Sequence, residues 1–564
     1  MREGAAGGEW FGRLPMVVRV VSHVTVWTCV LVPVIVVLSR GWLAIGDDAV
    51  IAIRAHQALS LSPPLVGMYS TAGNGLGHYL YDPGPLLFWL LAVPVHIDPS
   101  RGLLWGAAFC WGAALSLAIE AVWSTRLWLG CALVPFVAVD LLWVAPRVLE
   151  DPSWNAYFPI PFFIATLVLA WVVGTGSFGW WPALVGVASV AAQCHLIFAI
   201  PAVGLTLLAP VVGVVATGRP RRLRWLVVGI IVAVACWAAP LLQNLGRNGN
   251  LSALAHSSHG SKTLGLGFGL HILAAAGAPF PIWLRHEPLG FFSVAAFTGE
   301  HSSALGVIVL CLLAAICVAA ALTRQRALAV LGVVGLVASI SLVASFAIFP
   351  VKNSISVDYL IIVAWVVGIL VWTVVVWAAV SMVALLVRPA RKVPVADGRP
   401  VVGGTEGVGT EPAAPEGPTP AAGGGLGGVV RRSPVATLLL GVAIVGVLAG
   451  FTTAGLRPAL AFQPALDTVS WDHQEVLRVR HVTTAIEHAV PRGPVVYSID
   501  ASSAGALSTI WITEGVAWQL EQDGWRAGLF SIERAYTQLK PRRGAPTVKV
   551  VIDGTKVVSI QHAH

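Results

Sequence analysis

Charged residues are scarce in this chain. Only 11% of its 564 residues are charged, whereas 57% are hydrophobic. Soluble domains carry about a quarter charged residues, so this composition excludes an ordinary soluble enzyme. Charges are costly inside a bilayer, and the 23 Trp suit a membrane protein because indole rings favour the headgroup layer.

The sequence also lacks cysteines at the spacings typical of disulfides or metal sites. The seven Cys lie in or beside apolar runs, and the last hundred residues contain none. This excludes a disulfide framework and a CxxC metal site. The net charge of +8 comes from small basic clusters beside apolar runs. Such clusters set membrane topology and contact anionic lipid, so we expect no nucleic-acid partner.

Long apolar runs dominate what is present, and they predict a polytopic α-helical membrane protein with about eleven transmembrane helices. The first run, 16–40, lacks a small-x-small cleavage site and is interpreted as an uncleaved span. The predicted spans are 16–40, 102–123, 127–145, 156–174, 179–194, 196–217, 225–243, 303–323, 327–349, 357–387 and 434–455.

Basic residues fix the predicted orientation. With the N terminus in the cytoplasm, every strong basic cluster falls on the inner side. The C terminus is then extracytoplasmic, and the predicted location is the plasma membrane. This fit requires that 85–97, a run of 13 residues, lies on the outer surface, because it is too short to cross. The inner clusters are Arg126, 219–224, Arg324 with Arg326, 388–392, and Arg431 with Arg432.

The predicted domains follow from these runs. Residues 1–387 form the transmembrane module, with outer loops at 41–101 and 244–302. The Gly/Pro-rich stretch 388–433 is a disordered cytoplasmic linker, and 434–455 is the last span. Residues 456–564 form a small extracytoplasmic α/β domain, with strand patterns at 494–499, 547–552 and 556–560 and a helical pattern at 513–523.

The first outer loop carries the strongest chemical signal, the adjacent pair Asp47 and Asp48. Side chains of neighbouring residues diverge, so one carboxylate can act as a base in a cavity while the other caps a helix at 49–59. Alternatively, both are solvated N-cap residues. Further candidates for substrate binding in this loop are Arg54, His56, Tyr69, His78 and Asp82.

Three later segments add candidates. In the loop 146–158, Glu150, Asp151 and Asn155 can hold a hydroxyl-rich ligand or a cation, and Trp154 can stack on a sugar; the alternative is a polar loop with an interfacial Trp. Gln193 and His195 interrupt an apolar run, where a lone His is more often a packing residue. Arg247 and Lys262 in the loop 244–302 can bind phosphate, although surface cations are common.

An acidic pair follows span one, Asp82-Pro83-Gly84-Pro85 leads into a short apolar helix, and a soluble domain ends the chain. This layout resembles the GT-C superfamily of membrane glycosyltransferases. Protein O-mannosyltransferases, aminoarabinose transferases of lipid A and mycobacterial arabinofuranosyltransferases share it. The segment 64–70 with 83–85, and the triplets 153–155 and 249–251, resemble an uncharacterised actinobacterial branch with PLVG-YSR followed by HPGP. Asp48, Thr71 and Asp82 depart from that pattern, where Trp, Arg and His are expected.

The resemblance implies a sugar transfer at the outer face, from a polyprenyl-phosphate donor to a glycan, lipid or protein acceptor of the cell envelope or cell wall. Asp47 matches the catalytic acidic residue of the superfamily, and a single base implies inversion. A divalent cation stays open as a cofactor, although no metal-ligand spacing is present. Two other classes are weighed: a transporter or flippase of a lipid-linked precursor, and a scaffold displaying the C-terminal domain. In that domain Trp471, Trp511 and Trp518 form either a carbohydrate platform or core.

Overall fold

The computed structural model describes residues 4–70, 79–125, 127–218, 223–246, 249–257, 262–279, 281–284, 302–351, 357–386, 473–501, 506–529, 539, 541 and 544–563. The described residues are mostly helical (74%). The elements before residue 200 are α1 (Gly4–Ser39), α2 (Asp47–Gln57), β1 (Tyr69–Ser70), β2 (Leu80–Tyr81), α3 (Leu86–Ile97), α4 (Gly102–Ser124), η2 (Trp128–Ala132), α5 (Leu133–Val144), α6 (Pro146–Glu150), α7 (Pro159–Gly174), η3 (Phe178–Trp180), α8 (Trp181–Cys194) and η4 (Leu196–Phe198).

The remaining membrane helices and the C-terminal elements complete the described chain. They are α9 (Ala199–Thr217), α10 (Leu223–Asn244), α11 (Asn250–His256), α12 (Gly265–Gly277), η5 (Ile282–Leu284), α14 (Ser303–Leu322), α15 (Arg326–Ala347), α16 (Val357–Leu386), α19 (His473–Ala489), β3 (Pro494–Ala501), α20 (Ala506–Gln522), β4 (Arg526–Gly528), β5 (Thr547–Asp553) and β6 (Lys556–Ala563).

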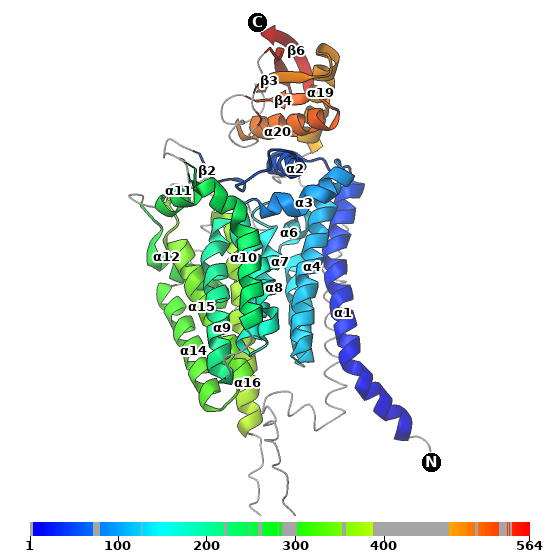
Figure 1. Cartoon of the computed structure of the whole chain (residues 1–564). Helices are drawn as coiled ribbons and strands as arrows, with labels where there is room; N and C mark the ends of the chain where they lie inside the picture. Colours follow the sequence, from blue (N-terminus) through cyan, green and yellow to red (C-terminus); the bar gives the residue numbers. More distant parts are fainter. Residues whose placement is uncertain are drawn as a thin grey trace, which may run out of the picture.

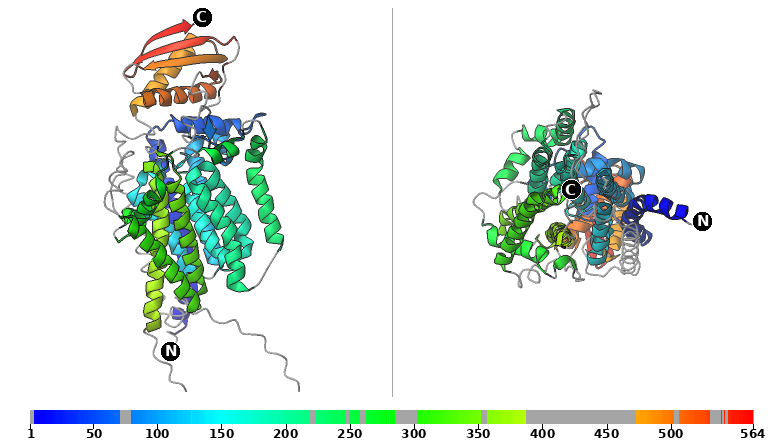
Figure 2. Two further views of the ribbon diagram at one scale, coloured as in Figure 1. Left: turned by 90° about the vertical axis from the view of Figure 1, so that its left-hand side faces the viewer. Right: turned by 90° about the horizontal axis from the view of Figure 1, so that it is seen from below.

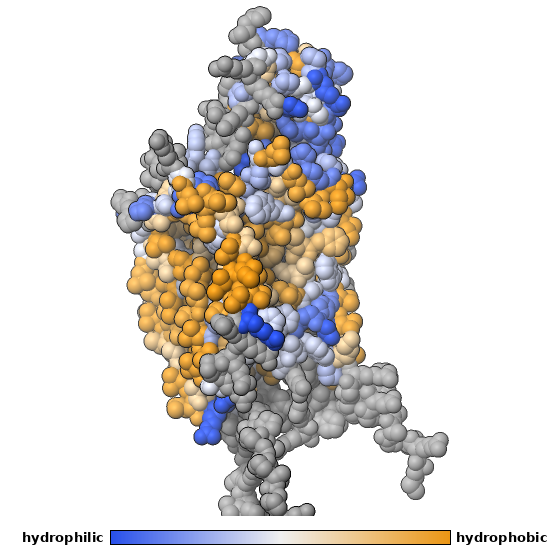
Figure 3. Space-filling view, in the orientation of Figure 1, coloured by the Kyte–Doolittle hydropathy of each residue, from blue (hydrophilic) through white to orange (hydrophobic). Residues whose placement is uncertain are grey.

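The long helices stand side by side in one bundle, with the C-terminal domain at one end and the start of α1 at the other (Figures 1 and 2). Apolar side chains cover much of the bundle surface in view, whereas the C-terminal domain is largely hydrophilic (Figure 3). Within the described ranges, eight helices are long and apolar enough to cross a membrane. The chain is therefore a multi-pass helical membrane protein.

Seven of these eight helices coincide with predicted spans. Three other predicted spans, 127–145, 156–174 and 179–194, correspond to the shorter apolar helices Gly130–Val144, Pro159–Gly174 and Phe178–Cys194. The predicted break at 193–195 is confirmed, because α8 ends at Cys194 and η4 starts at Leu196. The linker 388–433 and the span 434–455 lie outside the described residues.

The predicted outer loop 244–302 contains a helix, α12, that the sequence did not predict. The stretch Gly265–Leu284 counts by length and composition among the eight apolar helices. Its glycines dilute the apolar signal but allow close packing. A Cβ on Gly269 would lie 2.4 Å from the carbonyl oxygen of Val343 in α15, and one on Gly306 of α14 would lie 2.2 Å from that of Leu270.

Helices α12 and α14 both start beside the end of α15. The Leu264 N–H donates to the Phe349 carbonyl (2.9 Å), directly before α12. The short turn between α14 and α15 makes those two helices antiparallel, so the start of α14 lies beside the end of α15. The chain thus returns to the same end of the bundle between α12 and α14. At about 20 Å, the 13 residues of α12 alone do not reach across the hydrocarbon layer.

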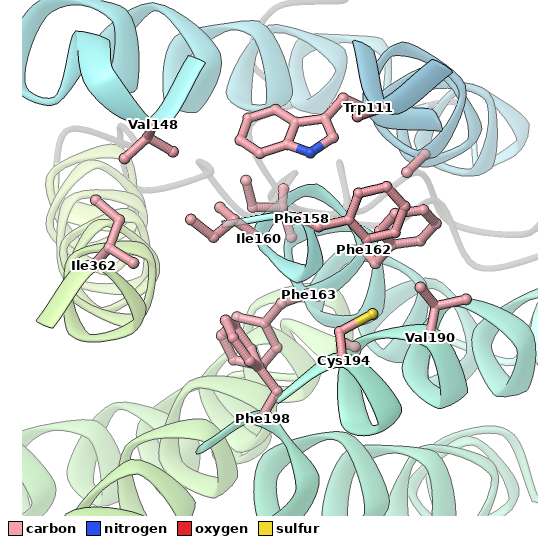
Figure 4. Packing of buried hydrophobic residues seen from close by; sticks show 14 of the residues in the cluster. Trp111, Val148, Phe158, Ile160, Phe162, Phe163, Val190, Cys194, Phe198 and Ile362 are labelled. Atoms are coloured by element: carbon pink, nitrogen blue, oxygen red, sulfur yellow. The ribbon is translucent and has the colours of Figure 1, made fainter. Parts of the chain in front are cut away.

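Helix α7 is the centre of the bundle, because all of its residues, Pro159 to Gly174, are buried. Figure 4 shows aromatic side chains of α7 packed between α4, α8 and α16. Phe163 meets Phe198 of η4 edge to face, with ring centroids 5.3 Å apart. Complete burial distinguishes α7 from α10 and α14, which expose many apolar side chains. The residues directly before α7 are therefore attached to a helix that is packed on all sides.

The C-terminal domain is a four-stranded sheet in the order β4-β3-β5-β6, with α19 and α20 on one face (Figure 2). Strand β3 is parallel to β4 and β5, and β6 is antiparallel to β5. The predicted strands at 494–499, 547–552 and 556–560 and the predicted helix at 513–523 are confirmed. Trp518 is buried (2% exposed), which excludes it from a carbohydrate platform; Trp471 lies outside the described residues.

Candidate functional site

The two adjacent carboxylates open α2 and point to different partners from one loop. Asp47 is half-buried, and its Oδ2 accepts a hydrogen bond from Trp154 Nε1 (2.7 Å). Asp48 is 2% exposed, and its Oδ1 accepts from Ser153 Oγ (2.8 Å). The divergence expected of neighbouring side chains is present, and both partners come from the segment before α7.

Ser153 connects Asp48 to a second buried carboxyl group. Its Oγ lies 2.8 Å from Asp48 Oδ1 and 3.2 Å from Asp151 Oδ1. A hydroxyl has one proton to donate, so both contacts are hydrogen bonds only when one of the two carboxyl groups is protonated. Burial first, then the charge of Asp151, raises the pKa of Asp48 well above its ordinary value. The shared contact with Ser153 and the burial of Asp48 both favour a protonated form of this pair.

Asp82 is the third buried carboxyl group at this place, at 2% exposure. Its Oδ2 accepts from Asn155 Nδ2 (3.1 Å). Burial raises the pKa of Asp82 well above its ordinary value, the Asn155 bond opposes this, and the nearby Asp47 adds to it. The three consecutive residues 153–155 thus each bind a different carboxylate.

Backbone contacts hold Asp82 in position. The Gly67 N–H donates to the Asp82 carbonyl (3.0 Å), and the Asp82 N–H donates to Met68 (2.7 Å). A Cβ on Gly67 would lie 2.8 Å from Asp82 Cβ, so this approach requires glycine. The two motifs around 64–70 and 82–85 therefore fold against each other, and β1 and β2 continue their pairing.

Asn250 and Gln193 tie this loop to later helices. The Asn250 side chain in α11 accepts from the Tyr81 N–H (3.0 Å) and donates to the Tyr81 carbonyl (2.9 Å). The backbone carbonyl of Gln193 in α8 accepts from the Gly84 N–H (3.4 Å), while the Gln193 side chain donates to the Cys236 carbonyl of α10 (2.7 Å). The sequence analysis named Gln193 as a candidate beside His195, but it included Ser153 and Asn250 only as members of the triplets 153–155 and 249–251.

Among Asp47, Asp48, Asp82 and Asp151, Asp47 alone is half-buried and the other three are buried. Burial raises the pKa of Asp47, and the hydrogen bond from Trp154 opposes this by stabilising the ionised form. Asp48 and Asp82 have their pKa values raised well above the ordinary range. Environments that shift neighbouring carboxyl groups by different amounts are the means by which proteins separate a base from a neutral acid.

Arg54 brings a buried positive charge to the same helix. It is 5% exposed and lies over the Phe88 ring, with its guanidinium carbon 5.7 Å from the centroid. Burial lowers its pKa to about 10. In the described part of the chain its hydrogen bond goes to Gln57 Oε1 (2.9 Å), and no carboxylate lies within ion-pair distance. A buried cation in this state favours an anionic ligand.

Arg54 and Asp47 share one side of α2. Seven residues separate them, which corresponds to nearly two turns, or about 10 Å along the helix axis. A monosaccharide with an attached phosphate has this length. The first turn of α2 thus offers a carboxylate, and the last turn a buried guanidinium.

Other predicted site residues have different surroundings. His56 stacks on His96 (centroids 4.5 Å apart) and meets Trp518 of the C-terminal domain (6.0 Å). His195 caps η4, with its Nδ1 accepting from the Ile197 N–H (3.3 Å), which fits a packing role. Lys262 is exposed, and Tyr69 is half-buried beside Tyr79 and Tyr81.

Glu150 ends α6 and is buried (4% exposed), next in sequence to Asp151. His78 and Arg247 lie outside the described residues. No group of three or more His, Cys, Asp or Glu has the arrangement of a metal site among the residues that were placed.

Comparison with protein-family models, with curated proteins and with solved structures gave no match to this chain. Its function is therefore argued from the site.

Proposed function

We propose that this protein is a membrane glycosyltransferase that transfers a sugar from a polyprenyl-phosphate donor to a cell-envelope acceptor, in the manner of the GT-C superfamily. One observation supports this most: Asp47 is the least buried carboxylate of an otherwise buried acidic cluster, and Trp154 donates a hydrogen bond to it. The domain end of the bundle is proposed to face the outside of the plasma membrane.

In this reaction Asp47 acts as the general base. Trp154 occupies Oδ2, so Oδ1 takes the proton from the acceptor hydroxyl. The acceptor oxygen forms a bond to the anomeric carbon while the bond from that carbon to the phosphate oxygen breaks. Lipid phosphate leaves as an anion, and the charge of Arg54 stabilises it. A single displacement inverts the anomeric configuration.

The test is transfer by the reconstituted protein with a panel of radiolabelled polyprenyl-phosphate sugars. Asp47→Asn keeps the shape of the side chain but removes the base, so transfer should fall by about 10²–10⁴-fold. Expression and donor binding should stay unchanged. Asp48→Asn is the matched control and should retain most activity. Wild-type transfer by Asp47→Asn would refute the proposed role of this carboxylate.

A transporter or flippase is the second candidate, and ionisable groups inside the bundle would favour it. Arg19, His23 and Glu120 form such a group between α1 and α4. Glu120, however, lies in the last turns of α4, and Arg19 is five residues from the start of its apolar segment. This group is therefore near the end of the spans, where a transport site at mid-depth is not expected.

A further inference from the structure

Helix α20 of the C-terminal domain is buried on two sides. Ile512, Val516 and Leu520 are fully buried, and every residue from 512 to 518 has little exposure. A helix at the surface of a small domain normally keeps one polar face in water. Helix α20 lacks such a face over these two turns because its second side lies on α2 (Figure 1).

The closest contact is at Gly46, directly before Asp47. The Gly46 N–H donates to the Trp511 carbonyl (3.2 Å). Gly46 has φ +55°, and a Cβ at this position would lie 2.8 Å from Trp511 Cδ1. Both the backbone conformation and the contact with the indole ring therefore require glycine.

Two more contacts extend this interface along α2. A Cβ on Gly515 would lie 3.0 Å from Ile45 Cγ2, so the two backbones approach closely. At the other end of α2, the Trp518 ring faces the edge of His56 at 6.0 Å between centroids. We call the contacts of Trp511, Gly515 and Trp518 with residues 45–56 the clamp.

We infer that the C-terminal domain is a fixed clamp on α2 that positions Asp47 for the proposed transfer. The domain holds both ends of the helix that carries the base, and it supplies the acceptor for the backbone N–H next to that base. Trp511 is a positioning residue in this arrangement. The docking of the domain stands without the proposed function, whereas its effect on transfer rests on it.

Docking is tested by a disulfide in the full-length protein. Cysteines replace Ile45 and Gly515, and a protease site is inserted in the Gly/Pro-rich stretch 393–430. After cleavage in native membranes, the two fragments should stay joined until they are reduced. The matched control pairs Ile45→Cys with Val558→Cys, because Val558 is 63% exposed on β6, and its fragments should separate. Separation of the fragments in both variants would overturn the clamp.

A second probe covers the case in which Gly515→Cys disturbs the domain, since its Cβ would also approach Val479 Cγ2 (2.9 Å). A photoreactive benzoylphenylalanine at position 511 should crosslink to the segment 44–47 in an otherwise unchanged chain. Crosslinks found only within residues 473–563 would contradict the inferred docking.

The fixed character of the clamp is tested by transfer before and after reduction of the disulfide. Equal rates support a domain that stays in place during turnover. Inhibition that reduction reverses would show that the domain must lift, which contradicts the inference. Asp47→Asn in the same assay reports on the proposed function separately.

The positioning role of Trp511 is tested by comparing two substitutions. Trp511→Ala removes the ring against Gly46 and should lower kcat about tenfold with little change in KM for the donor, because a misplaced base slows chemistry more than binding. Trp511→Phe should restore most of the rate. Gly46→Ala should lower the crosslinking yield and kcat together. Full activity of Gly46→Ala and Trp511→Ala would exclude the positioning role.

Discussion

Charged side chains gather near both ends of the described bundle, and they are arranged differently. Near the end of α4, opposite charges meet: Arg19 Nε donates to Glu120 Oε1 (2.8 Å), and His23 Nε2 donates to the same oxygen (2.7 Å). Beside α2, carboxyl groups meet each other, and the buried Arg54 has no carboxylate in reach among the described residues.

The cluster of Arg19 and Glu120 balances its own charges, whereas the cluster beside α2 does not. Arg19 also lies over the Trp123 ring (5.1 Å), so the cluster with Glu120 satisfies its own members and connects α1 to α4. The cluster beside α2 keeps like charges together and leaves a cation available, an arrangement that costs stability and is typical of binding or catalytic sites.

The largest effect on this comparison should come from Arg54. Arg54→Met keeps the apolar stem but removes the charge, and transfer should fall by about 10²-fold, because losing one partner of a buried charge contact costs about 2–5 kcal/mol. Arg54→Lys should recover part of the loss. Rates at saturating and limiting donor measure it. An unchanged KM and kcat in Arg54→Met would place the lipid phosphate elsewhere.

A second prediction concerns pH. Asp47 must be ionised to act as a base, so transfer should decline as the pH falls through its raised pKa. The Trp154 bond lowers that pKa, so Trp154→Phe should move the acidic limb to higher pH by about 1–2 units, the equivalent of one hydrogen bond to a charged group. The pH–rate profile measures this shift. An acidic limb that stays in place in Trp154→Phe would assign it to another group.

The ion pair at the other end should affect stability alone. Glu120→Gln removes the acceptor charge for Arg19 and should lower the free energy of unfolding by about 1–3 kcal/mol, less than a fully buried pair because both side chains are about a third exposed. Thermal unfolding in detergent measures the loss. Transfer per folded molecule should remain at the wild-type rate. A loss of transfer in Glu120→Gln would show that the cluster of Arg19 and Glu120 also contributes to the reaction.

The smallest effect is expected from Asp48→Asn. Burial and the neighbouring Asp151 raise the pKa of Asp48 and so favour its neutral form, which the amide mimics, and transfer should change by less than about threefold. A raised folded-state pKa means that Asp48 lowers stability as the pH rises from the unfolded value, about 3.9, through the folded one. Asp48→Asn should therefore be the more stable variant at alkaline pH. Equal melting temperatures of the two proteins at pH 6 and pH 9 would contradict this.

The length of an apolar run predicted the bounds of a helix well where that helix faces lipid on one side. The predicted spans 102–123 and 303–323 coincide with α4 and α14 to within one residue. The method failed for α12, whose glycines serve helix contacts, and it extended α5 and α7 beyond their ends. A helix such as α7 that is buried among other helices does not need an apolar run long enough to cross the membrane by itself.

The local pattern of Asp47 and Asp48 at a helix start singled out the pair but did not tell the two residues apart. The choice of Asp47 as the base came only from the resemblance. Their partners Ser153 and Trp154 are 105 and 107 residues away, a pairing that depends on where α7 begins. The contact of Trp511 with Gly46 joins the two ends of the chain and has no local signature.

The shortness of α7 has a further consequence. Its 16 residues extend about 24 Å, less than the 30 Å of a typical hydrocarbon layer. Residues 151–155, shortly before this buried helix, are themselves buried or, in the case of Trp154, half-buried. For an enzyme of the proposed class, an activated sugar held there is shielded from bulk water. Hydrolysis of the donor, the wasteful side reaction of every glycosyl transfer, then becomes slow without any moving gate.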